Sequence, residues 1–168
     1  MQSHAHKKAH ARVTLIDYVP GNSIHRERFG ALNREWLTKY FYVEPHDEAM
    51  FADPETIVLG KGKDGTILFA EAEGNIVGTG GLLRLRDGSF ELVRMAVTED
   101  YQGCGIGEQI LAALLERVRA KGVKKVFIVS NTLLENAIRL YRRHGFKDSA
   151  ENRHTHYARG NITLELAL

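Results

Sequence analysis

The sequence predicts a mixed α/β (α+β) fold in which a mostly antiparallel sheet carries helices. Three apolar segments between Thr66 and Val97 follow one another through tight turns, which is typical of an antiparallel meander. The third segment then passes through a glycine-rich loop into an amphipathic helix and another apolar strand. A strand–helix–strand unit of this kind is right-handed and makes its two strands parallel. A meander joined to a parallel pair is a mixed sheet.

Length and composition favour a single soluble domain. The chain has 168 residues, enough for one domain with a substantial core. Its 23 Lys+Arg and 21 Asp+Glu residues leave a net charge of +2, so nothing in the charge demands nucleic acid or an anionic membrane. Neither an apolar run of about 20 residues nor a signal-peptide core is present, and we expect a cytoplasmic location. The single cysteine, Cys104, rules out an intrachain disulfide and a cysteine-based zinc site.

The first segment, residues 1–11, is expected to be a disordered tail. It contains His4, His6 and His10 among polar residues, with little to bury. A metal site formed by these histidines is conceivable, but a solvated terminus is the better interpretation, and no metal is predicted. Residues 12–168 are expected to form a single domain.

The next part of the chain predicts a strand followed by two helices. Residues 12–19 form a strand pattern that the turn Pro20-Gly21-Asn22 closes. Apolar residues at helical spacing predict a helix over 23–40, which ends in an aromatic cluster around Phe41, and a short helix over 46–52. This aromatic and acidic region either lines a substrate pocket or packs under the helices.

The meander comes next, as strands over 66–73, 75–85 and 90–97. Gly78, Gly80 and Gly81 in its middle strand indicate a bulge or a close backbone approach. The remaining elements are, in order, a helix that begins after the glycine loop and stops at Lys121-Gly122, a strand over 124–130, a helix over 133–144, a short strand within 146–150, a polar loop over 151–157 and a final strand within 158–168.

The segment 90–107 indicates an anion-binding site. A strand that runs through Gly103, Gly105 and Gly107 into a helix presents unpaired backbone N–H groups to an anion, and the glycines allow a close approach. A Walker A loop requires Lys-Ser/Thr after the last glycine, whereas Glu108-Gln109 follows here. A dinucleotide fingerprint requires different glycine spacing near the first strand of a Rossmann unit. A third pattern, Gln/Arg-x-x-Gly-x-Gly/Ala, is present as Gln102 to Gly107.

Together with two further segments, this loop resembles the GNAT superfamily of N-acetyltransferases. Met95-Ala96-Val97 precedes the loop, and Ser130-Asn131 closes the next strand. The run from Asn136 to Phe146 then matches the superfamily pattern Asn-x-x-Ala-x-x-Leu-Tyr-x-x-x-Gly-Phe. The resemblance extends from about Ile67 to Phe146. It implies a twisted sheet of six to seven strands with helices on both faces and a splayed parallel pair at the centre.

The resemblance also implies acetyl-CoA as co-substrate. Backbone N–H groups of the loop would hold its pyrophosphate, and the pantetheine arm would lie in the gap between the parallel strands, with Asn136 bonded to it. A backbone N–H near Val97 would meet the thioester carbonyl. The residues expected to contact the cofactor are Met95, Ala96, Val97, Gln102, Gly103, Cys104, Gly105, Ile106, Gly107, Glu108, Asn131, Asn136 and Tyr141.

Two residues are candidates for proton transfer. Attack of an amine on a thioester requires loss of a proton from the amine and gain of one by the thiolate. Tyr141 is the candidate acid, in a position that the superfamily often uses in this way. Glu91 is the candidate base. Alternation along the strand is expected to place it on the same apolar face as Val93, Met95 and Val97, where burial would raise the pKa of its carboxyl. The alternative to Glu91 as the base is an ordered water chain. The purely structural explanations would be core packing for Tyr141 and an ion pair for Glu91.

Cys104 and the histidines His144, His154 and His156 are not expected to take part in the reaction. A thiol at a helix N-terminus could accept acetyl in a ping-pong route, but this slot of the loop is far from the expected acetyl position, so Cys104 is interpreted as a small filler. His144, His154 and His156 are expected at the surface, the last two beside the substrate loop.

The predicted reaction is direct acetyl transfer to a primary amine within a ternary complex. A small-molecule amine or amino acid is favoured over a protein acceptor, and a homodimer is compatible with the resemblance. The acids Glu44, Asp47 and Glu48 and the bases Arg153 and Arg159 leave polyamine, amino-acid and peptide acceptors open. The alternative function is a non-catalytic acyl-CoA sensor, which would keep the loop and lose the proton chemistry.

Overall fold

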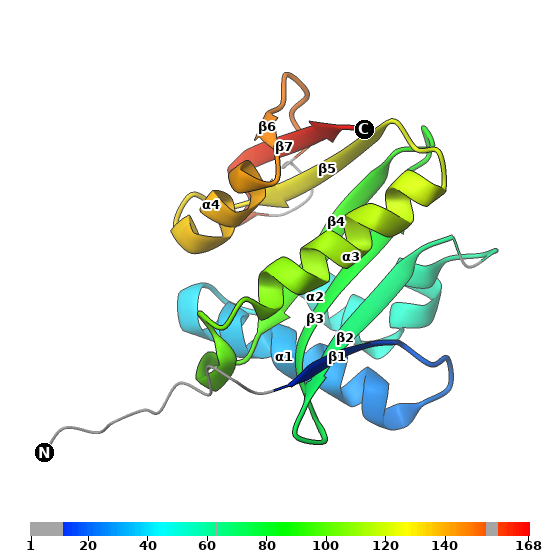
Figure 1. Cartoon of the computed structure of the whole chain (residues 1–168), viewed down its shortest axis with the longest axis vertical. Coiled ribbons are helices and arrows are strands. Elements are labelled where there is room, and N and C mark those ends of the chain that lie inside the picture. The colour runs from blue at the N-terminus through cyan, green and yellow to red at the C-terminus, as the bar shows by residue number, and fades with distance from the viewer. Residues whose placement is uncertain (1–11, 63, 154–157) are drawn as a thin grey trace, which may run out of the picture.

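The fold is a seven-stranded mixed sheet with helices on both faces (Figure 1). A computed structural model describes residues 12–62, 64–153 and 158–168. The predicted tail at 1–11 lies outside the described residues, as do His154 and His156. The elements are β1 (Val13–Asp17), α1 (Ser23–Tyr40), α2 (Pro45–Ala52), the π-helical turn η1 (Glu55–Leu59), β2 (Thr66–Ala72), β3 (Asn75–Arg84), β4 (Phe90–Val97), the 3-10 turn η2 (Glu99–Tyr101), α3 (Ile106–Ala120), β5 (Lys125–Ser130), α4 (Glu135–Arg143), β6 (Lys147–Asp148) and β7 (Ile162–Ala167).

The strand order is β1-β2-β3-β4-β5-β7-β6, and every pair is antiparallel except β4 with β5. The predicted meander, the parallel pair and the number of strands are therefore confirmed. Two short turns, η1 and η2, were not expected, because segments of five and three residues carry too little periodicity to be seen in a sequence. The strand expected within 146–150 is only two residues long.

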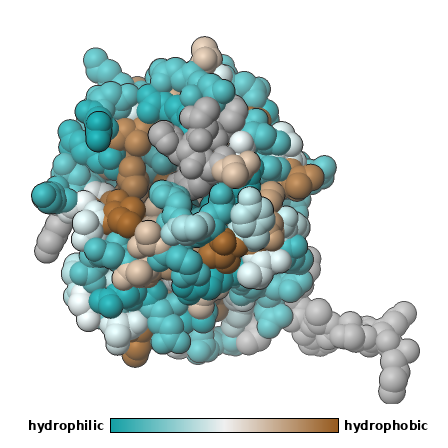
Figure 2. All heavy atoms as spheres, turned by 180° about the vertical axis from the view of Figure 1, so that it is seen from behind, coloured by the Kyte–Doolittle hydropathy of each residue, from teal (hydrophilic) through white to brown (hydrophobic). Residues whose placement is uncertain are grey.

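Two hydrophobic clusters cover the two faces of the sheet. One lies between the sheet and α3 and includes Ile110, Leu111 and Leu114, while the other lies against α1 and α2 and includes Phe29 and Phe51. Figure 1 shows α3 in front of the sheet and α1 and α2 behind it. Seen from behind, the surface is mostly hydrophilic, with hydrophobic atoms in small separate groups (Figure 2). Within the described part of the chain, no helix has the length and apolar character needed to cross a membrane.

The parallel pair is paired only at its start. Phe90, Glu91 and Leu92 lie opposite Val126, Phe127 and Ile128, and the ladder ends there although both strands continue. Beyond this point β4 and β5 diverge (Figure 1), so that the two strands are splayed as the resemblance implied.

A bulge in β4 changes which side chains face which helix layer. The pairing of β3 with β4 shifts between Thr79 and Gly81, and Arg94 has a φ of 58° in the left-handed region. A Cβ on Gly80 would lie 2.4 Å from Sδ of Met95, so the glycine leaves room for the bulged strand. The predicted bulge or close approach at these glycines is confirmed.

The bulge also overturns one part of the sequence prediction. Before it, Val93 packs in the cluster under α1 and α2, whereas after it Met95 and Val97 pack against the α3 cluster. Glu91 lies opposite Leu83, which belongs to the α1 and α2 side. Glu91 therefore shares a face with Val93 but not with Met95 and Val97, because strict alternation along a strand holds only without a bulge.

Candidate active site

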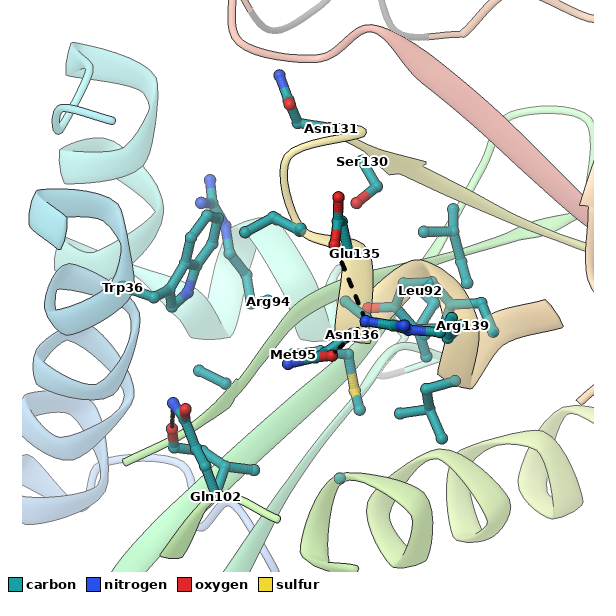
Figure 3. A pocket seen from close by; sticks show the side chains of 18 of the residues that line it. Trp36, Leu92, Arg94, Met95, Gln102, Ser130, Asn131, Glu135, Asn136 and Arg139 are labelled. Atoms are coloured by element: carbon teal, nitrogen blue, oxygen red, sulfur yellow. Dashed lines mark hydrogen bonds and ion pairs between the residues drawn. The ribbon is translucent and has the colours of Figure 1, made fainter. Parts of the chain in front are cut away.

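A cleft of about 710 Å³ opens where β4 and β5 separate. Its walls come from both strands, the loop before α3, the first turn of α3, the length of α4, the end of α1, and Arg159 and Gly160 before β7. In Figure 3, Trp36 and Arg94 lie on one side of the pocket, and Glu135, Asn136 and Arg139 lie on the opposite side. We call these the α1 side and the α4 side.

The loop before α3 has the geometry of an anion cradle. Gly103 and Gly105 have φ angles of 76° and 80°, which side-chain-bearing residues rarely adopt, and Gly105 is the N-cap of α3. The first N–H groups of a helix have no partner within it and carry a partial positive charge. Nε2 of Gln102 donates to the carbonyl of Val97 at 2.9 Å and so ties the loop to the end of β4. The cradle therefore fits a pyrophosphate group.

Most of the predicted cofactor contacts lie around this cleft. Its lining includes Met95, Ala96, Val97, Gln102, Gly103, Gly105, Ile106, Gly107, Glu108, Asn131, Asn136 and Tyr141. The side chain of Cys104 is the exception, because it packs against the α3 cluster and its Sγ lies 3.7 Å from the carbonyl of Gln102. A contact through the Cys104 backbone stays a prediction.

The two asparagines that line the cleft, Asn131 after β5 and Asn136 in α4, already have protein partners. Asn131 donates to the carbonyl of Arg159 at 2.6 Å and accepts from the backbone N–H of Leu133 at 2.8 Å. Oδ1 of Asn136 accepts from Nη2 of Arg139 at 2.9 Å. Asn131 thus fixes the end of β5 to the segment before β7, while Asn136 is exposed at the cleft and its orientation is set by the bond from Arg139.

Glu91 is poised to ionise near neutral pH. Its carboxyl is largely removed from water, and burial raises its pKa from 4.5 to about 7, against the opposing effect of Arg94 and Arg153. A carboxyl with a pKa near the working pH is well suited to accept a proton. The expected rise in pKa is therefore present, although the bulge places Glu91 on the other face from Met95.

Tyr141 reaches the cleft from the opposite layer of the molecule. The residue is only 6% exposed, and its ring meets Phe146 edge to face with centroids 6.0 Å apart. Burial raises the pKa of its phenol above the ordinary value of 10. The hydroxyl consequently stays protonated over the whole physiological range and can only act as a donor of its proton, not as a resident base.

A buried ion cluster closes the α1 side. Asp47 accepts from Arg94 at 2.7 Å and from Nη1 of Arg159 at 2.8 Å, and Arg159 also pairs with Glu44. Burial opposes ionisation of Asp47, but the bonds from Arg159, the Glu44 backbone and Arg94 outweigh it and hold its pKa below the usual value. The sequence gives no sign of the link between Arg94 and Asp47, because no spacing connects positions so far apart.

Three aromatic residues line the α1 side of the cleft: Trp36, Tyr40 and Phe41. The rings of Trp36 and Phe41 meet edge to face with centroids 6.2 Å apart. Phe51, from the same predicted aromatic region, is buried in the core under α2. Of the two interpretations of this region, pocket lining thus applies to the first three residues and core packing to Phe51.

The structure joins a glycine cradle at a helix N-terminus to a split between two parallel strands, as the resemblance implied. The chain belongs to the acetyltransferase (GNAT) family, whose family model matches residues 31–146.

Comparisons with known proteins agree with this membership. The chain is 32% identical over 88 residues to N-acetyltransferase 8 of Rattus norvegicus and 33% identical over 82 residues to the probable N-acetyltransferase camello of Xenopus tropicalis. These matches cover 49% and 48% of this chain but only 40% and 37% of the relatives, so the chain spans about two fifths of their length.

Solved structures share the fold across almost the whole chain. A GNAT-family acetyltransferase from Staphylococcus aureus superposes with a TM-score of 0.79 at 18% identity, covering 93% of this chain and 99% of that one. A GNAT-family acetyltransferase from Elizabethkingia anophelis, solved with acetyl-CoA bound, superposes with a TM-score of 0.68 at 20% identity, covering 93% and 98%.

Proposed function

We propose that this protein is an N-acetyltransferase that moves the acetyl group of acetyl-CoA to a primary amine. The observation that carries the proposal is the continuity of β4, the glycine cradle and α3 along one side of a cleft of about 710 Å³. The same cleft is lined by this anion site and by two proton-transfer candidates, Glu91 and Tyr141. We infer that residues 12–168 act as one domain and that the acceptor is a small amine or amino acid rather than a protein.

The chain supplies binding, orientation and proton transfer. N–H groups at Gly103 to Gly107 bind the pyrophosphate, and the exposed backbone edges of β4 and β5 beyond Leu92 and Ile128 align the pantetheine arm between them. The amine nitrogen bonds to the acetyl carbon as the carbon–sulfur bond breaks. Glu91 receives the proton that the amine loses, directly or through water, and Tyr141 donates a proton to the departing thiolate. Transfer is direct, in a ternary complex.

The proton-transfer candidates favour an enzyme over a non-catalytic acyl-CoA sensor. A sensor requires the cradle but neither a carboxyl held near a pKa of 7 nor a buried phenol beside the cleft. A buried carboxyl lowers the stability of the fold whenever it is charged. A buried Glu91 is therefore easier to explain if the carboxyl takes part in a reaction.

A matched pair of loop variants tests cofactor binding. Gly105 adopts a φ of 80° with no atom within 4 Å of the position that a Cβ would take, and Asn and Asp are the residues that best tolerate this conformation. Gly105→Asp and Gly105→Asn differ by one charge, and a carboxylate in the cradle would repel the pyrophosphate. We expect acetyl-CoA to raise the melting temperature of the wild type and of Gly105→Asn, and the affinity of Gly105→Asp to be about tenfold lower or worse than that of Gly105→Asn.

Turnover is then measured as thiol release over a panel of primary amines. Release that depends on both acetyl-CoA and an amine supports the enzyme. Stabilisation by acetyl-CoA with no turnover of any amine would favour the sensor, and no stabilisation by acetyl-CoA would exclude both functions.

A further inference from the structure

The α1 side of the cleft has an aromatic wall that is fixed in place. Nε1 of Trp36 donates to Oδ1 of Asn33 at 3.2 Å, and Nδ2 of the fully buried Asn33 donates to the carbonyl of Phe29 at 2.9 Å. This chain of bonds anchors the indole to the core of α1. Phe41 then packs at 90° against the indole. A wall whose rings are already oriented loses little entropy when it binds a ligand.

The rings of the wall, Trp36, Tyr40 and Phe41, are not buried in the core. Tyr40 is 48% exposed and lines the cleft, and Trp36 and Phe41 are half-buried there. Aromatic rings that only stabilise a core are covered on both faces, as Phe29 and Phe51 are. Trp36 and Phe41 are held in place and left partly open on the cleft, and together with the more exposed Tyr40 they form a surface for a planar apolar group.

The charges around the wall argue against a polycationic acceptor. Of the acids near it, Glu44 pairs with Arg159, Asp47 pairs with both Arg94 and Arg159, and Glu48 lies 2.7 Å from Arg34. Among the described residues that line the cleft, the acids are Glu91, Glu108 and Glu135, and the last two come from α3 and α4 on the far side. The α1 side therefore offers one carboxyl to an acceptor, enough for one amino group.

We propose that the acceptor is an aromatic monoamine whose ring packs against Trp36, Tyr40 and Phe41 while its amino group points to Glu91. This inference rests on the proposed function and narrows its acceptor. A phenyl ring two or three bonds from the nitrogen supplies the planar group. Among the described residues, the α1 side has no further cleft-lining carboxylate to receive a second amino group.

The first test compares acceptors of matched size. In 2-phenylethylamine the ring is planar, 2-cyclohexylethylamine has the same length with a puckered ring, and spermidine carries three amino groups. We expect kcat/KM to be highest for 2-phenylethylamine, about tenfold lower for the cyclohexyl analogue and lower again for spermidine. Turnover that is fastest with spermidine would overturn the inference and leave the acetyltransferase function standing.

The second test uses variants of the wall. Tyr40→Ala should lower kcat/KM for 2-phenylethylamine about tenfold, with the KM for acetyl-CoA unchanged. Tyr42 is the matched control, because it is 60% exposed two residues further along and does not line the cleft, so Tyr42→Ala should behave as the wild type. Equal kcat/KM in Tyr40→Ala and the wild type would overturn the inference.

A binding measurement separates this inference from the chemistry. Trp36 is the one tryptophan in the sequence, so emission excited at about 295 nm reports on the wall itself. In the presence of CoA, 2-phenylethylamine should change this emission with saturation, in the wild type and in Tyr42→Ala. An unchanged emission would count against the wall as the binding surface, even for an enzyme that acetylates other amines. Absence of both acetyl-CoA binding and turnover would instead remove the proposed function and this inference together.

Discussion

The carboxylate of Asp47 lies 2.7 Å from the guanidinium of Arg94, and the two side chains are 0% and 4% exposed. Asp47 also caps α2, since its Oδ2 accepts from the backbone N–H of Glu44 at 2.8 Å. One buried carboxylate therefore holds together the first turn of α2, the bulge of β4 and, through Arg159, the segment before β7. Removing its charge would take one carboxylate partner from the buried Arg94 and one from the part-buried Arg159, which also pairs with Glu44.

Asp47→Asn should consequently lower the free energy of unfolding by about 3–5 kcal/mol. Urea denaturation measures this directly. Glu48→Gln is the control next to it, because Glu48 pairs with Arg34 in solvent and should matter little. A loss in Asp47→Asn no larger than that in Glu48→Gln would show that the cluster does not support the fold.

Glu91→Gln should change activity and stability in opposite directions. The pKa of Glu91 is raised from 4.5 to about 7, so its charged form is disfavoured in the folded state, and stability falls as pH rises from about 4.5 through 7. The variant should be more stable than the wild type above pH 7, by up to roughly 3 kcal/mol. Its turnover should fall by about 10² or more, because the base is lost.

The pH–rate profile checks the role of Glu91. In the wild type, kcat/KM should rise through an apparent pKa near 7, and this limb should be absent in Glu91→Gln. The same limb in both proteins would assign the proton acceptor to another group, such as a water chain.

Tyr141→Phe should lower kcat by about 10² and leave the KM for acetyl-CoA nearly unchanged. The ring, which packs edge to face on Phe146, is kept in this variant, so the melting temperature should move little. Tyr18→Phe is the control, since Tyr18 is also buried but bonds to Glu55 at 3.1 Å and does not line the cleft. Equal kcat in the two variants would remove Tyr141 from the reaction.

Two glycine-to-alanine changes should differ in sign. A Cβ at Gly80 would lie 2.4 Å from Sδ of Met95 and 2.8 Å from Cγ2 of Ile110, so Gly80→Ala should cost about 1–3 kcal/mol. At Gly107, in the first turn of α3, the nearest atom would be Cδ2 of Leu140 at 3.6 Å, an ordinary contact. Gly107→Ala should therefore be neutral or stabilise the fold by about 0.5–1 kcal/mol, measured by thermal unfolding.

The regular elements could be predicted because each has its own period and its own end signals. The helix predicted over 23–40 matches α1 at both bounds, and the strands predicted over 66–73 and 75–85 match β2 and β3 to within one residue at each end. The cradle could also be predicted, because its chemistry depends on backbone N–H groups and on glycines that are close together in the sequence.

The bulge in β4, the ion cluster and the aromatic lining of the cleft could not be predicted, because they depend on contacts between residues that are distant in the sequence. No glycine or asparagine signals the left-handed backbone at Arg94, so the alternation of the sequence predicts, wrongly, that Glu91 shares a face with Met95. The cluster of Arg94, Asp47 and Arg159 joins positions with no common periodicity. Which aromatic residues face a cleft and which fill the core depends likewise on how α1 and α2 pack.

The ladder between β4 and β5 has only three residue pairs, so the seven-stranded sheet consists of two units with a weakly paired boundary between them. Strands β1 to β4 form one unit and β5 to β7 the other, and α3 spans the seam because its cluster includes Leu68 and Leu92 from one unit and Val126 and Leu164 from the other. Helix α3, which begins at the anion cradle, thus also packs against both units of the sheet and joins them. A ligand bound at the first turn of α3 therefore lies against the one helix whose cluster includes strands from both sides of the split.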